Sequence, residues 1–253
     1  MTDMPTDNPA PLIEVHDDAD ALATAVAGEL LNRIADAQAA GKVPDIGLTG
    51  GGIAEAIHRE IARLAPASGV DWGAVVLWFG DERFVPSDSP DRNVNRARAA
   101  FLDEVGARRV HTAPASDEVA TAEESAAAYG DAIRSGGSGD FDVLMLGIGP
   151  DGHVASLFPH HAGLDAVGAV TVAVHDSPKP PPDRVSLTFE ALNRAQSVWF
   201  VVSGEGKADA VRRALADVPA GEEEAALRAT PARGVAGKSE TVWFLDSAAA
   251  SLL

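Results

Sequence analysis

Three short stretches of this sequence combine turn residues with ionisable side chains that could do chemistry. The first is Gly147 to His153, reading GIGPDGH, in which Asp151 and His153 stand two residues apart. An imidazole titrates near pH 6.5, so a histidine can act as a general base, and a nearby carboxylate can help to orient it. A tight turn with a solvated histidine explains an isolated Asp-Gly-His equally well. The rest of the sequence is therefore needed to distinguish a catalytic turn from a purely structural one.

The other two stretches are Thr49-Gly50-Gly51-Gly52 and Asp81-Glu82-Arg83. Consecutive glycines that open a helix let backbone N–H groups approach an anion, which the helix dipole also favours. These glycines match neither a P-loop nor a dinucleotide-binding fingerprint, and a plain turn explains them alone. Asp81-Glu82-Arg83 follows a predicted strand, where acidic and basic side chains can orient a polyol and neutralise charge. A surface salt-bridge cluster is the commoner role of such a tripeptide.

Three basic residues elsewhere have settings that suggest an anionic ligand. Lys179 lies within SPKPPP (residues 177–182), and a polyproline segment is stiff, so its lysine loses little conformational entropy on binding. Arg184 begins the strand that follows. Lys207 lies in the first turn of a predicted helix, where it opposes the helix dipole and a bound phosphate would explain it. The six other histidines are interpreted as surface or structural residues.

Composition limits the partners that this protein can have. The chain has 253 residues, no cysteine, 20 basic and 38 acidic residues, and a formal charge of −18. A surface of that charge repels nucleic acid and anionic lipid, so an anionic substrate must be met by a few clustered cations. The sequence has no signal-peptide pattern and no apolar run of about 18 residues, which favours a cytoplasmic protein.

Strands and helices alternate along the chain, which predicts an α/β fold with a mostly parallel, doubly wound sheet flanked by helices. Residues 1–10 are expected to form a flexible tail and residues 11–253 a single domain. Strands are predicted at residues 12–15, 46–48, 75–79, 141–146, 170–174, 184–187, 198–202 and 242–245, and helices at 22–41, 53–64, 95–102, 120–133 and 204–216. The apolar run at 141–146 predicts a strand buried on both faces, and ligands bind where such strands end.

Taken together, five segments resemble the 6-phosphogluconolactonase family. They are residues 48–52, 78–95, 146–159, 177–187 and 204–207, and they occur in the order that the family shows. The resemblance implies a modified Rossmann-like α/β fold, within a superfamily that also holds glucosamine-6-phosphate deaminase/isomerase. It implies hydrolysis of 6-phosphoglucono-δ-lactone to 6-phosphogluconate in the pentose phosphate route, with no metal or cofactor. The expected partner is that small sugar-phosphate lactone, with no nucleic acid or membrane, and a monomer is favoured over an obligate oligomer.

The resemblance also implies roles for individual residues. His153 would take a proton from the attacking water, Asp151 would help to orient it, and Arg83 with backbone N–H groups would stabilise the oxyanion. Asp81 would hold sugar hydroxyls. The expected contacts of the phosphate or carboxylate are Thr49, Gly50, Gly51, Gly52, Lys179, Arg184 and Lys207. Gly52 stands where family members often carry Ser or Thr, so Thr49 or backbone N–H groups would have to replace that hydroxyl. Val154 stands where Thr is common, which is interpreted as a packing change.

Two alternatives remain open at this point. A deaminase/isomerase of the same superfamily shares the glycine, Asp-Glu and Asp-Gly-His segments, but it carries a carboxylate about five residues beyond the histidine, where this sequence has Phe158. A sugar-phosphate-sensing regulator would carry a DNA-binding helix-turn-helix in front. The first ten residues leave no room for one, and the charge of −18 would repel DNA.

Overall fold

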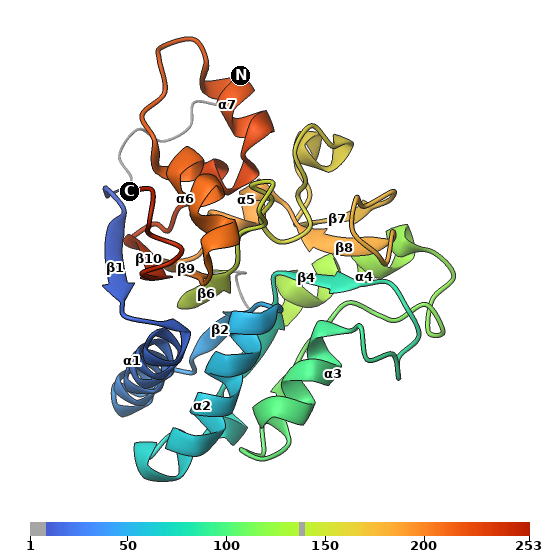
Figure 1. The fold of residues 1–253 in the computed structure, drawn as a ribbon. Coiled ribbons are helices and arrows are strands. Elements are labelled where there is room, and N and C mark those ends of the chain that lie inside the picture. The colour runs from blue at the N-terminus through green and yellow to red at the C-terminus, as the bar shows by residue number, and fades with distance from the viewer. Residues whose placement is uncertain (1–8, 137–139) are drawn as a thin grey trace.

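A seven-stranded parallel sheet forms the centre of this computed structural model, which describes residues 9–136 and 140–253 (Figure 1). The strand order is β1-β10-β9-β6-β2-β3-β5, and every pairing is parallel. β6 lies in the middle with all four residues buried, as predicted. The bounds are β1 (Leu12–His16), β2 (Asp45–Leu48), β3 (Val76–Phe79), β5 (Arg109–Val110), β6 (Val143–Leu146), β9 (Ser197–Val202) and β10 (Glu240–Asp246).

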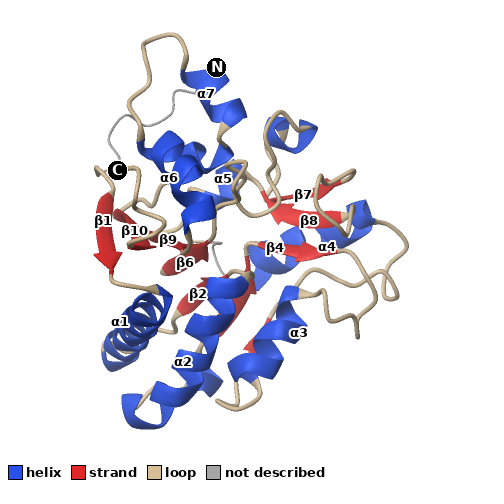
Figure 2. Ribbon diagram, viewed as in Figure 1, coloured by secondary structure: helices blue, strands red, loops and turns tan. Residues whose placement is uncertain are grey.

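Helices cover both faces of this sheet, which explains why its inner strands read as continuous apolar runs (Figure 2). Alternate residues of β6 enter different cores: Val143 and Met145 pack in the cluster of α1 (Ala19–Ala39) and α2 (Gly52–Ser68). Leu144 and Leu146 pack in the cluster that holds buried residues of α4 (Ala122–Gly136) and α6 (Ala208–Leu215). The prediction of a mostly parallel α/β fold is therefore confirmed. The other helices are α3 (Asn93–Ala97), continued by a π-helical turn at Arg98–Leu102, α5 (Phe189–Leu192) and α7 (Glu223–Ala229).

A second, antiparallel sheet of three strands was not predicted. It has the order β4-β8-β7, with β4 at Asp81–Arg83, β8 at Arg184–Leu187 and β7 at Thr171–Val174. The chain leaves β3, passes Gly80 and enters β4 directly, and the N–H of Leu187 donates to the carbonyl of Gly80. In the register Asp81 faces Ser186, and Arg83 faces Arg184. This pairing brings two of the predicted site segments together across about a hundred residues of sequence.

The strand order reverses between β2 and β6. From β2 the chain moves outward to β3, and from β6 it moves the other way to β9 and β10. Such a switch point opens a crevice at the carboxyl ends of the strands, and here it receives the turns at residues 49–52 and 147–153. Residues 1–8 of the expected tail lie outside the described residues. Within residues 9–136 and 140–253, no helix has the length and apolar character needed to span a bilayer.

Candidate active site

A small polar cavity of about 170 Å³ lies in this crevice. Nine of the eleven predicted site residues line it: Thr49, Gly50, Gly51, Asp81, Arg83, His153, Lys179, Arg184 and Lys207. Asp151 reaches the site through its hydrogen bond to His153. Gly52 is the first residue of α2 and lines a neighbouring cavity. The sequence reasoning missed four further lining residues, namely Asn93, Gly147, Ile148 and Ala155. Residues far apart in the chain therefore converge on one site.

The side chains of Asp151 and His153 form a short hydrogen bond, with 2.6 Å between Oδ1 of Asp151 and Nδ1 of His153. Because an ionised carboxylate only accepts hydrogen bonds, Nδ1 carries the proton and Nε2 keeps its lone pair. Burial raises the pKa of the Asp151 carboxyl, but the hydrogen bond and charge of His153 and the charge of Lys179 hold it well below its usual range. The Phe158 ring packs against the imidazole at 4.6 Å between centroids. The pair is therefore arranged for a histidine that accepts a proton at Nε2.

Gly149 makes this arrangement possible. The turn closes through hydrogen bonds from the N–H of Gly149 to the carbonyl of His153 and from the N–H of Gly152 to the carbonyl of Gly149. A Cβ at Gly149 would lie 2.0 Å from Nδ1 of His153 and 2.3 Å from Oδ1 of Asp151. The Asp–His pair is therefore packed directly on the glycine backbone, which no other residue permits.

The three predicted cations differ in how freely they can meet a ligand. The guanidinium of Arg184 donates to the carbonyls of Lys179, Pro180 and Pro181 at 2.9–3.2 Å, so it braces the proline segment. The ammonium of Lys179 lies 3.3 Å from Nδ1 of His153. Lys207 donates to a carbonyl of the 147–153 turn at 2.6 Å. Burial, helped by the charge of Lys179, lowers its pKa.

Asp81 and Asn93 line the cavity, and their side chains are hydrogen-bonded to each other. The amide of Asn93 donates from Nδ2 to the carbonyl and to Oδ1 of Asp81, at 2.9 and 3.2 Å. Its Oδ1 is buried and has no hydrogen-bond partner among the described residues. A Cβ at Gly50 would lie 2.1 Å from that oxygen. Gly50 therefore makes room for the side chain of Asn93, and it also lines the cavity.

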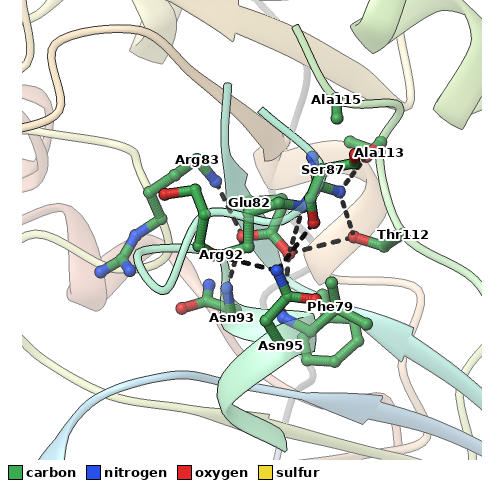
Figure 3. Close-up of polar contacts among 12 residues, drawn as sticks. Phe79, Glu82, Arg83, Ser87, Arg92, Asn93, Asn95, Thr112, Ala113 and Ala115 are labelled. Atoms are coloured by element: carbon green, nitrogen blue, oxygen red, sulfur yellow. Dashed lines mark hydrogen bonds and ion pairs between the residues drawn. The ribbon is translucent and has the colours of Figure 1, made fainter. Parts of the chain in front are cut away.

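A buried carboxylate organises the segment between Arg83 and Asn93 (Figure 3). Glu82 is 1 % exposed, and it accepts from the N–H groups of Arg83 and Asn93 at 2.9 and 2.6 Å. It also accepts from the N–H of Val94 at 3.0 Å and from the hydroxyl of Thr112 at 3.1 Å. Since Asn93 and Val94 begin α3, Glu82 caps that helix from a neighbouring strand.

Side chains alternate between the two faces of β4, so Glu82 lies on the opposite face from its two neighbours. Asp81 and Arg83 line the cavity, whereas Glu82 points to the other side. This alternation could have been read from the sequence once Asp81–Arg83 had been recognised as a strand. Asn93 carried no comparable signal, because only the fold brings it against Gly50.

Comparison with known proteins agrees with this geometry. Residues 17–243 match the family described as glucosamine-6-phosphate isomerases/6-phosphogluconolactonase. The 6-phosphogluconolactonase of Streptomyces coelicolor is 42 % identical, over 96 % of this chain and 95 % of its own length. The human 6-phosphogluconolactonase is 38 % identical, over 97 % and 95 % respectively. The solved structure of 6-phosphogluconolactonase from Trypanosoma brucei superposes with a TM-score of 0.79 at 28 % identity, covering 96 % of this chain and 98 % of that one. The chain therefore belongs to the family of glucosamine-6-phosphate isomerases and 6-phosphogluconolactonases.

Proposed function

We propose that this protein hydrolyses 6-phosphoglucono-δ-lactone to 6-phosphogluconate, as a step of the pentose phosphate route. The proposal rests on the hydrogen bond between Asp151 and Nδ1 of His153, which leaves Nε2 available in a cavity lined by cations. Nε2 takes a proton from water as the water oxygen attacks the lactone carbonyl. The tetrahedral intermediate then expels the ring oxygen, which leaves as a hydroxyl after accepting that proton from the imidazolium.

The other cavity residues suit the remaining parts of such a substrate. The guanidinium of Arg83 and backbone N–H groups would stabilise the oxyanion, since preorganised donors act most strongly where charge develops. Asp81 lines the cavity and would accept from sugar hydroxyls. The phosphate fits Lys207 and the N–H groups at residues 49–52, where α2 begins. Gly52 brings no side-chain hydroxyl, and Thr49 lines the cavity in its place.

The first test is lactone hydrolysis by the purified protein, measured above the spontaneous background. His153→Ala should lower kcat by on the order of 10²-fold or more while the fold stays intact, because a general base is removed. A folded variant that keeps most of its activity would exclude His153 from the mechanism.

The deaminase alternative is tested in the same preparation by release of ammonia from glucosamine 6-phosphate. Phe158 argues against it, because this side chain is 1 % exposed and packs against His153 and the Arg184 guanidinium, where the deaminase machinery needs a carboxylate. Ammonia release faster than lactone hydrolysis would reverse this assignment.

We further propose a monomeric cytoplasmic enzyme that binds no nucleic acid. The formal charge of −18 supports the last point, because it opposes any polyanionic partner. Sedimentation analysis tests the monomer, and a gel-shift assay with duplex DNA tests the regulator alternative.

A further inference from the structure

The carboxylate of Asp81 is held by other side chains at both of its oxygens. Oδ1 accepts from Nδ2 of Asn93 at 3.2 Å, and Oδ2 accepts from the hydroxyl of Ser156 at 2.6 Å. A carboxylate offers about four lone-pair sites on its two oxygens, so each oxygen of Asp81 can still accept from a further donor. Asp81 lines the cavity, whereas Ser156 is fully buried. The orientation of this carboxylate is therefore set by its protein neighbours before any ligand binds.

Ser156 connects the turn that carries His153 to the small antiparallel sheet. It follows His153 by three residues, and its N–H donates to Oγ of Ser186 at 3.2 Å. Ser186 faces Asp81 in the register of β4 and β8, so both hydrogen bonds of Ser156 end on one pair of facing residues. Ala155, the residue before Ser156, lines the cavity with a φ of 49°, a conformation that is strained for any residue except glycine. Ser156 therefore fixes a strained segment of the cavity wall against the strand that carries Asp81.

A guanidinium competes for the same carboxylate. Nη1 of Arg184 lies 3.9 Å from Oδ2 of Asp81, which is the oxygen that Ser156 holds. Charged N–H···O hydrogen bonds are about 2.7–2.9 Å long, so a movement of about 1 Å would convert this contact into a direct ion pair. Solvent screens the attraction only weakly, because both side chains are largely buried. Such an ion pair would occupy lone pairs of Asp81 that are otherwise available to a sugar hydroxyl.

We propose that Ser156 is a positioning residue, whose hydroxyl holds the Asp81 carboxylate apart from Arg184 and so keeps it available to hydroxyls of the substrate. This inference rests on the proposed function, in which Asp81 accepts from sugar hydroxyls. A contact to a hydroxyl that does not react is present in the ground state and in the transition state alike. Its loss therefore raises KM more than it lowers kcat.

The test measures kcat and KM of lactone hydrolysis for Ser156→Ala and for a matched control, Ser125→Ala. Ser125 is also fully buried, and its hydroxyl donates at 2.6 Å to the carbonyl of Pro114. Each variant loses one buried hydrogen bond, so both should show a lower melting temperature. Ser156→Ala should raise KM about tenfold, as expected for the loss of a charge-assisted hydrogen bond, and should change kcat less than about threefold. Ser125→Ala should keep the wild-type KM.

A double-mutant comparison separates an effect through Asp81 from a general structural effect. In an Asp81→Ala background, Ser156→Ala should leave kcat/KM unchanged, because the group that it positions has been removed. A further fall of about tenfold in that background, or an equal rise of KM in Ser125→Ala, would overturn the inference. If Ser156→Ala does not fold, Ser156→Cys keeps a side chain of similar shape with a weaker donor and should also raise KM.

A crystal structure of Ser156→Ala gives a readout that needs no turnover. In this variant Nη1 of Arg184 should lie within about 3 Å of Oδ2 of Asp81. That geometry in a protein without lactonase activity would support the positioning role and refute only the proposed function. A carboxylate that keeps its wild-type orientation refutes the inference itself, as does one that turns in an active enzyme without a change in KM.

Discussion

Adding one methyl group at Gly149 should separate the two residues on which the proposed chemistry depends. The new Cβ of Gly149→Ala would lie 2.0 Å from Nδ1 of His153 and 2.3 Å from Oδ1 of Asp151. Ordinary contact begins near 3.4 Å, so the imidazole must move by roughly 1.4 Å, or the turn must deform. A misplacement of about 1 Å can cost on the order of 10²-fold in rate. We therefore expect kcat to fall by about 100-fold, with a smaller change in KM because the phosphate contacts are remote.

The assay is lactone hydrolysis at pH 7.5, with the unfolding transition measured in parallel. Gly28→Ala is the matched control, because Gly28 lies within α1 and its Cβ would meet nothing within 4 Å. The control should keep full activity and gain stability, by up to about 1 kcal/mol, as alanine does in a helix. A Gly149→Ala protein with near-normal kcat would show that the contact between Asp151 and His153 is not needed for turnover.

Three further outcomes follow from buried polar groups. Glu82→Gln replaces one acceptor oxygen by a donor and should lower the free energy of unfolding by about 1–3 kcal/mol, more than Thr112→Val, in urea titrations. Arg184→Lys keeps the charge but loses the guanidinium contacts to three carbonyls, so kcat and the melting temperature should both fall; full activity would mean that charge alone is required. His58 is fully buried, and burial lowers its pKa to about 3. The folded state therefore favours the neutral imidazole. This contribution to the free energy of unfolding is fully present above about pH 6.5 and is lost as the pH falls toward 3. Between pH 7 and pH 5 the free energy of unfolding of the wild type should fall by about 2 kcal/mol more than that of His58→Leu. Equal decreases in the two proteins would refute this role of His58.

The sequence predicted those parts of the molecule that depend on local patterns. The apolar run before Gly147 predicted β6, which the structure confirms with all four residues buried. Nine predicted residues meet in the cavity because each follows or begins a strand. Local patterns could not reveal pairings between distant segments. The three-residue strand β4 has too few positions for a periodic signal, and the place of Lys179 beside His153 depends on how β8 pairs with β4.

The cavity is built from five separate stretches of the chain, including residues that follow β2 and β6 of the large sheet and residues of β4 and β8 of the small one. None of these stretches alone contains the complete set, so binding is thermodynamically linked to the folded state of both sheets. A ligand that binds only the folded chain stabilises it by about 2.7 kcal/mol at a hundred times its Kd. The product 6-phosphogluconate should therefore raise the unfolding temperature with rising concentration. Amide hydrogens of β4 and β8 should gain protection from exchange together with those of β2 and β6.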